Sequence, residues 1–252
     1  MKKIIIANWK MNPQTAKEAR RLFDAIKKGV RPIKNTEVVI APSFVHLSLF
    51  KPSGSIKLAA QDLFFEDPPA GRRAYTGEIS ASMLKDLKVS YVIVGHSERR
   101  QYIGESDELI SKKLESAFSR GFKTVLCVGE KEREEGGFSD IVRMQLKKAL
   151  SCLSRNYTSR LIIAYEPLWA ISTTKGARAD TPQNAFEMTI FIRRAMLDIW
   201  GKNAALKIPI LYGGSVNSKN AKGFLDVKGI SGLLVGGASL KPDEFIKILR
   251  LS

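Results

Sequence analysis

The sequence predicts an α/β fold: one closed barrel of eight parallel strands, each followed by a helix, in a single domain over residues 1–252. Eight short runs rich in Val, Ile and Leu recur along the chain, helix-sized segments separate them, and no linker divides the 252 residues. Runs without polar alternation are typical of strands covered on both faces, which are usually parallel. A doubly wound open sheet is the alternative, but eight strand–helix units favour the closed barrel.

The expected strands share β-branched or leucine-rich cores of four to seven residues. In chain order they are KIIIAN (3–8), EVVIAP (37–42), IKLAAQ (56–61), YVIVGH (91–96), KTVLCVG (123–129), LIIAYE (161–166), IPILYGG (208–214) and GLLVGG (232–237). Several of them end in a polar residue or in paired glycines. We therefore expect the functional groups at the carboxyl ends of the strands.

The segments between these runs have helical spacing. In 15–29 the apolar residues recur every three or four positions, as on one face of a helix, and Gly29 is expected to end it. The segment 181–201 has Thr181 as an expected N-cap, Pro182 at the first helical position and Gly201 after the end.

Composition limits the class of protein. Hydrophobic residues make up 44% of the chain, enough for a large core, and no run approaches the roughly 20 apolar residues of a membrane helix. The amino-terminal residues lack the long apolar segment of a secretory signal, so we expect a cytoplasmic location. The two cysteines, Cys127 and Cys152, have no metal-site or disulfide spacing and are expected to be buried thiols.

The chain is strongly basic, with a formal net charge of +16. A positive charge of this size can attract nucleic acids, acidic membranes or anionic small molecules. The basic residues are scattered along the sequence and form no aromatic-interleaved cluster. We therefore expect a solvated basic surface, with nucleic-acid binding as the less favoured alternative.

The residues that end the expected strands include an amide, a cation, an imidazole and a carboxylate. They are Asn8, Lys10, Gln61, His96 and Glu166. Each has a purely structural alternative, since a lysine can extend to solvent and a buried histidine can be a hydrogen-bonded core group. Parallel barrels carry their active sites at the carboxyl ends of the strands, so these side chains are expected to converge there. The other histidine, His46, is expected on a surface helix without a role.

Paired glycines end the last two strands, at 213–214 and 236–237. Glycines after the seventh and eighth strands of a barrel are typical of a phosphate site made of backbone N–H groups. A side chain at these positions would keep a phosphate at a distance. The substrate is therefore expected to carry a phosphate, although simple turns are the alternative.

Six motifs across the chain, in order, resemble the triosephosphate isomerase family: ANWKMN (7–12), GHSERR (95–100), CVGE (127–130), AYEPLWAI (164–171), YGGSVN (212–217) and LVGGASL (234–240). The resemblance implies the TIM barrel fold and interconversion of dihydroxyacetone phosphate and glyceraldehyde 3-phosphate through an enediolate. It implies no metal and no organic cofactor. There are two alternatives to this function. One is another barrel enzyme that acts on phosphorylated sugars, such as an aldolase, and the other is a catalytically silent barrel that binds nucleic acid.

The resemblance also implies the roles of individual residues. Glu166 would be the base that moves a proton between two substrate carbons, and His96 a neutral imidazole that polarises the carbonyl. Lys10 would place positive charge beside the developing oxyanion, and Asn8 would orient the substrate oxygens. Phosphate would be bound at Ser172, Gly214, Ser215, Gly236 and Gly237, and Cys127 would pack behind the carboxylate.

Glu98 is expected to support Lys10 as a neighbouring carboxylate; a surface ion pair with Arg99 or Arg100 is the alternative. GHSERR also reads as a strand that turns into a helix, and a helix N-terminus near His96 would disfavour its protonated form.

Two segments depart from the family. The expected lid, 166–180, has Ser172 and Thr174 where the family has glycines and is a few residues longer, with hinges expected at 167–169 and 175–177. The loop after the third strand, 62–75, is also longer. The resemblance implies a homodimer through this loop, with Thr76 reaching the neighbouring subunit. In the lengthened part of the loop, Pro68, Pro69, Arg72 and Arg73 are expected to change the dimer interface. A surface insertion that leaves the dimer intact is the alternative.

Overall fold

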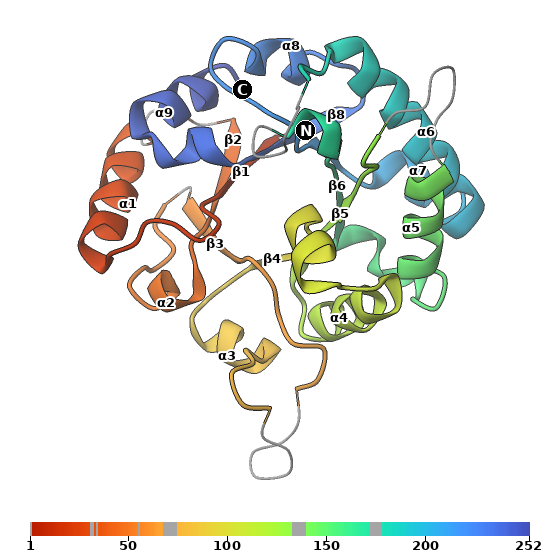
Figure 1. The fold of residues 1–252 in the computed structure, drawn as a ribbon, viewed down its shortest axis with the longest axis horizontal. Helices are drawn as coiled ribbons and strands as arrows, with labels where there is room; N and C mark the ends of the chain where they lie inside the picture. Colours follow the sequence, from red (N-terminus) through yellow and green to blue (C-terminus); the bar gives the residue numbers. More distant parts are fainter. Residues whose placement is uncertain are drawn as a thin grey trace.

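The structure, a computed structural model, describes residues 2–30, 33, 35–54, 56–67, 75–132, 140–171 and 178–252. Eight strands form a closed parallel barrel in sequence order, and the last strand pairs with the first (Figure 1). The strands are β1 Lys3–Asn8, β2 Thr36–Ala41, β3 Ile56–Ala60, β4 Tyr91–Val94, β5 Lys123–Val128, β6 Leu161–Tyr165, β7 Ile210–Tyr212 and β8 Ile230–Val235. The predicted fold class is confirmed.

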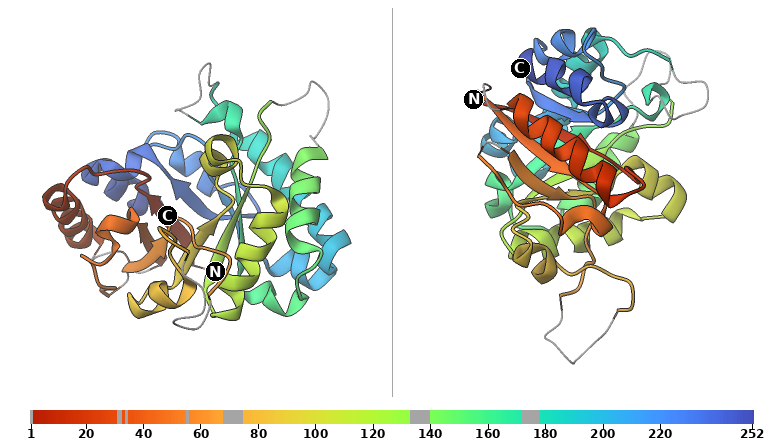
Figure 2. Two further views of the ribbon diagram at one scale, coloured as in Figure 1. Left: turned by 60° about the horizontal axis from the view of Figure 1, so that its bottom comes forward. Right: turned by 90° about the vertical axis from the view of Figure 1, so that its left-hand side faces the viewer.

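Helices surround the barrel (Figure 1). The α-helices are α1 Ala16–Val30, α2 Phe44–Leu47, α3 Ala81–Asp86, α4 Asp107–Ser119, α5 Asp140–Leu150, α6 Pro182–Trp200, α7 Lys202–Lys207, α8 Ala221–Leu225 and α9 Pro242–Arg250. Four short helical turns complete the order: η1 Arg99–Ile103, η2 Arg155–Ser159, η3 Leu168–Ala170 and η4 Gly237–Leu240. The first and last long helices, α1 and α9, lie side by side (Figures 1 and 2).

Both faces of each strand are apolar because both are covered. In β1, Ile4 and Ile6 belong to the cluster inside the barrel, whereas Ile5 and Ala7 belong to the cluster between strands and helices. Alternate side chains of a strand point to opposite faces, so a strand buried on both needs an unbroken apolar run. This arrangement explains the lack of polar alternation in the sequence.

The helix signals are confirmed for α6 and wrong at the end of α1. Thr181 caps α6, since its side chain accepts a hydrogen bond from the backbone N–H of Asn184. Gly29, expected to stop α1, lies inside it. A Cβ atom there would lie 2.2 Å from Cδ1 of Ile246, so this glycine allows α1 and α9 to pack closely.

Two further expectations are corrected. His46 lies in the short helix α2 but is buried, with its Nε2 atom 2.9 Å from the carbonyl oxygen of Pro13. Cys127 is buried as expected, whereas Cys152 is exposed in the turn after α5. Neither correction was visible in the local pattern, because both depend on what packs against the segment.

The strands end earlier than their apolar runs suggested, and the residues left over form the rim of the barrel. His96, Glu166 and the glycine pairs all follow the last strand residue rather than belonging to it. The backbone N–H groups of Glu166 and Gly213 still donate to the carbonyl oxygens of Val128 and Tyr165, so these residues are held to the neighbouring strands at the open end. None of the described helices has the length and apolar character needed to cross a membrane.

A buried ionic cluster lies beside this rim, between the start of the connection after β3 and α4. Lys113 Nζ contacts Asp62 Oδ2 at 2.6 Å and Glu105 Oε1 at 2.5 Å, and Arg99 contacts the same two carboxylates. Burial raises the pKa of Asp62 to about 6, because desolvation disfavours its charge more than the two cations favour it.

The pKa of Asp62 predicts a pH dependence of stability. The pKa of Asp62 is higher in the folded protein than in the unfolded chain, so between about pH 4 and 6 the folded protein binds this proton more tightly. The free energy of unfolding therefore falls as pH rises through that interval. Relative to wild type, the free energy of unfolding of Asp62→Asn should therefore increase by roughly 1–2 kcal/mol as pH rises from 4 to 7, because the variant lacks the titrating carboxyl. Lys113 and Arg99 keep Glu105 as a partner in this variant.

Denaturant unfolding from pH 4 to 7.5 at fixed protein concentration measures this difference, with Asp24→Asn on the exposed side of α1 as the matched control. An Asp62→Asn protein that is less stable than wild type by the same amount at every pH would contradict the assignment.

Candidate active site

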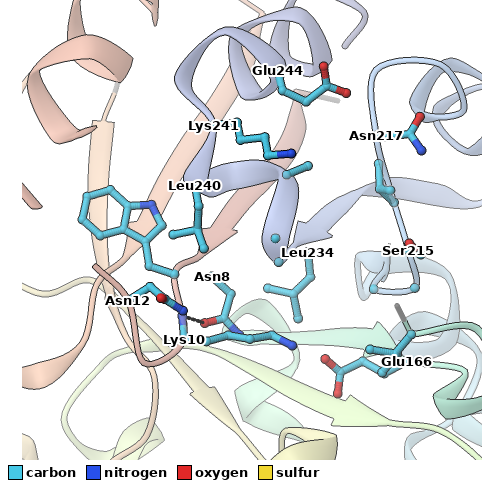
Figure 3. A pocket seen from close by; sticks show the side chains of 18 of the residues that line it. Asn8, Lys10, Asn12, Glu166, Ser215, Asn217, Leu234, Leu240, Lys241 and Glu244 are labelled. Carbon is cyan, nitrogen blue, oxygen red and sulfur yellow. Dashed lines mark hydrogen bonds between the residues drawn. The ribbon is translucent and has the colours of Figure 1, made fainter. Parts of the chain in front are cut away.

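The carboxyl ends of the strands enclose a cavity of about 460 Å³. Its lining includes Asn8, Lys10, His96 and Glu166, which come from the ends of three strands, β1, β4 and β6. Figure 3 shows the side chains of Lys10 and Glu166 extending toward each other across it. The structure therefore brings together the polar groups that the sequence placed at the rim.

Glu166 is held by two donors in the interior of this cavity. Its Oε1 atom lies 3.1 Å from Nε2 of His96, and its Oε2 atom accepts a hydrogen bond of 3.0 Å from the backbone N–H of Ser97. Only 2% of Glu166 and 7% of His96 are exposed. A buried carboxylate held in this way is positioned to take a proton from a molecule in the cavity.

The hydrogen bonds of His96 fix its tautomer. Its Nδ1 atom accepts a hydrogen bond of 3.2 Å from the backbone N–H of Glu98, so the ring proton is on Nε2. The Nε2–H group then donates to Glu166, and the imidazole is neutral. The carbonyl oxygen of His96 also accepts from the N–H groups of Arg99 and Arg100, which places the ring at the start of a helical turn. The expected helix is present as a short π-helical turn, η1.

Lys10 has an unusual backbone conformation, with φ of 54° in the left-handed region. Its N–H donates to Oδ1 of Asn8 at 3.0 Å, and Gln61 Nε2 donates to its carbonyl oxygen at 2.8 Å. Asn8 and Gln61 thus hold the turn that directs Lys10 into the cavity. The strain of such a conformation is characteristic of functional sites.

The Nζ atom of Lys10 lies 2.6 Å from Oε1 of Glu98. The predicted pairing of these residues is therefore present. The alternative pairing of Glu98 is absent among the described residues, since Arg99 pairs with Asp62 and Glu105 while Arg100 pairs with Asp107. The Glu98 carboxylate partly balances the positive charge of Lys10, which lines the cavity.

The four rim glycines have different reasons to lack a side chain. A Cβ atom at Gly213 would lie 2.9 Å from Cγ of Glu166, and one at Gly214 would lie 2.2 Å from the Tyr212 hydroxyl. At Gly236 it would approach Cε of Lys10 at 3.3 Å, whereas at Gly237 it would meet no atom within 4 Å. The first pair therefore also accommodates the protein's own groups, Glu166 and Tyr212.

Two connections bring the start of the expected lid to the rim. The backbone N–H of Ser215 donates to the carbonyl oxygen of Ala170 at 3.3 Å, and Arg178 N–H donates to the Trp169 carbonyl oxygen at 2.9 Å. Trp169 Nε1 donates to Oε1 of Glu130 at 2.9 Å. Ser172, Thr174 and the second hinge at 175–177 lie outside the described residues, as do Pro68, Pro69, Arg72 and Arg73.

Cys127 is buried near the carboxylate of Glu166. Burial raises the pKa of its thiol well above the usual value, and the negative charge of Glu166 raises it further. The thiol is neutral and serves as packing, as the sequence suggested.

Several lining residues were missed by the sequence argument. They are Asn12, Asn217, Leu234, Lys241 and Glu244. Glu244 accepts a hydrogen bond of 2.7 Å from the Ser218 backbone N–H, which lowers the pKa of its carboxyl. Asn12 and Asn217 stand at the ends of motifs that were singled out, whereas Lys241 and Glu244 begin the next helix and give no local signal.

Comparison with known proteins supports one family. A sequence model of the triosephosphate isomerase family matches residues 3–252. The triosephosphate isomerase of Dictyoglomus turgidum is 44% identical over 254 residues, covering 99% of each chain. That of Caldanaerobacter subterraneus subsp. tengcongensis is 44% identical over 253 residues, covering 98% of each, and that of Acetivibrio thermocellus is 46% identical over 255 residues, covering 99% of this chain and 98% of the relative.

The hydrogen bonds of His96 predict its tautomer in solution. At pH 7.5, ¹⁵N NMR of imidazole-labelled protein should show a protonated Nε2 and an unprotonated Nδ1, with His46→Gln separating the signals of the two histidines. A doubly protonated ring, or a proton on Nδ1, would contradict the geometry of Glu98 and His96.

Proposed function

This chain belongs to the triosephosphate isomerase family and interconverts dihydroxyacetone phosphate and glyceraldehyde 3-phosphate in glycolysis and gluconeogenesis, and we propose that Glu166, His96 and Lys10 carry out the reaction. The observation that supports this assignment is the buried Glu166 carboxylate beside the Nε2–H group of His96, in a cavity that Lys10 also lines.

Proton transfer between the two carbons is the task of Glu166. A hydrogen next to a carbonyl is weakly acidic, so its removal needs a positioned base and donors directed at the oxygen on which charge develops. The carboxylate takes the proton from one carbon to give an enediolate, and the resulting carboxylic acid returns it to the neighbouring carbon. The base is therefore regenerated in each turnover.

His96 and Lys10 act on the oxygens of the substrate. When substrate replaces Glu166 as the partner of the Nε2–H group, that group donates to the carbonyl oxygen and moves protons between the two oxygens. The Lys10 ammonium places positive charge beside the enediolate, where low dielectric strengthens the interaction. Asn8 orients substrate oxygens and holds the Lys10 turn, and Glu98 positions the Lys10 side chain. These side chains supply the base and the electrophile without a metal or an organic cofactor.

The phosphate is assigned to the main chain around Gly214, Ser215, Gly236 and Gly237. Gly237 supports this because its missing side chain leaves open space, and because η4 begins there, so that its first N–H groups have no partner within the helical turn. Ser215 N–H now donates to Ala170, so phosphate binding requires that contact to open. Ser172, outside the described residues, is proposed as a further backbone donor from the lid.

The lid assignment rests on chemistry as well as on resemblance. An enediolate phosphate loses its phosphate group if water enters and rotation is free, so the site needs closure during turnover. The segment 166–180 is the long connection that leaves the strand of the base. The hydrogen bonds of Trp169 and Arg178 support this assignment by joining its two ends.

The role of Glu166 predicts the effects of two substitutions. In a coupled assay starting from glyceraldehyde 3-phosphate, Glu166→Gln should reduce turnover by roughly 10³-fold or more because the amide cannot accept the proton. Glu166→Asp keeps a base but withdraws it by one methylene, and should cost about 10²-fold.

Glu115→Gln, on the exposed face of α4, is the matched control and should leave turnover unchanged. Equal turnover in wild type and both Glu166 variants, with all proteins folded, would remove Glu166 from the mechanism.

We also propose that the enzyme is a cytoplasmic homodimer. Large apolar side chains are exposed on the connections after β1, β2 and β4 and on α3: Met11, Val45, Met83, Tyr102 and Ile103. Two of the elements that carry them, α2 and α3, lie on the same side of the barrel as the described ends of the loop after β3 (Figure 1), and Thr76 in that loop is exposed. An exposed apolar set of this kind is characteristic of an interface. Thr76 is proposed to reach the neighbouring active site.

Ile103→Lys should weaken this dimer, because a charge at the interface must lose its hydration on assembly. Sedimentation velocity at micromolar concentration should show monomer for Ile103→Lys and dimer for Leu206→Lys, a control on α7 with a similar exposure of 63% against 65%. Unchanged dimers in both variants would contradict the proposed interface.

A further inference from the structure

The end of the barrel opposite the cavity has a surplus of positive charge. Lys57 in β3 and Lys123 in β5 lie near the Tyr91 ring, with their Nζ atoms 5.9 and 5.2 Å from its centroid. Both lysines share one carboxylate oxygen, Oε1 of Glu37, at 2.7 and 3.4 Å, and the Tyr91 hydroxyl donates to the same atom. Two ammonium groups, 42% and 43% exposed, thus have one counter-charge between them.

A second group of cations lies next to the first. Lys85 at the end of α3 has its Nζ atom 4.0 Å from the Phe122 ring centroid, and Arg160 donates to the carbonyl oxygen of Phe118. Neither cation has an ion-pair partner within the described ranges. Burial lowers the pKa of Lys85, and the nearby Arg160 lowers it further. The exposed Lys88 follows in the turn after α3.

Backbone hydrogen bonds place the two groups on one surface. Lys123 N–H donates to the Ser90 carbonyl oxygen at 3.1 Å, Ser90 N–H donates to Leu58, and Thr124 N–H donates to Arg160 at 2.8 Å. The cations therefore surround the amino-terminal ends of β3 to β6. We call this set the basic face, and it comprises Lys57, Lys85, Lys88, Lys123 and Arg160. Even with exposed Asp86 counted beside Glu37, cations exceed carboxylates by three.

Like charges held together at a partly dry surface repel one another, and a bound polyanion would relieve this repulsion. We propose that the basic face binds a linear chain of phosphate groups, as found in a nucleic-acid backbone or in inorganic polyphosphate. Cations distributed over four strand ends suit repeated charges better than a single anion.

The same surface indicates how such a ligand would be recognised. Tyr91 and Phe122, the two rings that the lysines of the basic face contact, are fully buried, so neither offers a surface on which a base could stack. Binding is therefore sequence-independent and electrostatic. The face is at the opposite end of the barrel from Glu166, so occupancy leaves the catalytic cavity open.

Fluorescence anisotropy with a labelled oligodeoxythymidylate of 20 nucleotides tests the proposal, with unlabelled inorganic polyphosphate as competitor. Binding should weaken steeply with added KCl, and four phosphate contacts would give a log–log slope of about −3. Direct binding of polyphosphate in filter retention, with no change in anisotropy of the oligonucleotide, would assign the source as the inorganic chain and still support a phosphate-chain site.

The variant Lys85→Gln/Lys88→Gln/Lys123→Gln should bind at least tenfold more weakly, while its isomerase turnover stays at the wild-type level and shows that it is folded. The matched control removes three exposed lysines elsewhere, Lys17→Gln/Lys147→Gln/Lys247→Gln, and has the same net charge.

Equal binding by the two triple variants would overturn the proposal, since net charge alone would then explain the affinity. So would failure of wild type to bind either phosphate chain at 50 mM KCl. Sedimentation with phosphatidylserine vesicles in the absence of phosphate-chain binding would replace the proposed ligand with a membrane surface.

Discussion

Closure of the barrel is the constraint on which the site depends. Strand β8 pairs with β1 in parallel, with Ile4 opposite Gly232, and a Cβ atom at Gly232 would lie 1.8 Å from the carbonyl oxygen of Ile4. Gly129 has the same function beside Glu166, whose carbonyl oxygen would be 1.8 Å from an added Cβ atom. Because all eight strands are parallel and the ring is closed, every strand end that carries a polar group faces the same opening.

The two ends of this barrel use charge in different ways. At the carboxyl ends, the proposed catalytic groups have defined partners: Lys10 has Glu98, and Glu166 has the N–H groups of His96 and Ser97. These partners hold the catalytic groups until substrate replaces them, so the site is organised before binding. At the amino-terminal ends, cations outnumber the carboxylates near them. The surplus at the basic face is three charges, which is a part of the formal net charge of +16 of the chain.

Much of the fold could be predicted from sequence because apolar runs report burial directly. The runs around Ile5 and Val125 are unbroken since both faces of those strands are covered, and Thr181 caps α6 through a local hydrogen bond. Gly29 could not be interpreted correctly, because its role depends on Ile246 in α9, more than 200 residues away. His46 gave no signal for a similar reason, since its partner is a carbonyl group on another connection.

The site followed the same division. Glu166 and His96 were predictable because a polar residue directly after an apolar strand is conspicuous, whereas Lys241 and Glu244 begin a helix and enter the cavity only through the turn before it.

The most direct measurement of the central claim is a crystal structure with an unreactive triose phosphate analogue. We expect its phosphate on the main-chain N–H groups of 214–215 and 236–237, and Glu166 released from Ser97 to within about 3.5 Å of the reacting carbons. Phosphate bound elsewhere, or a carboxylate still held by Ser97 away from the ligand, would contradict the account.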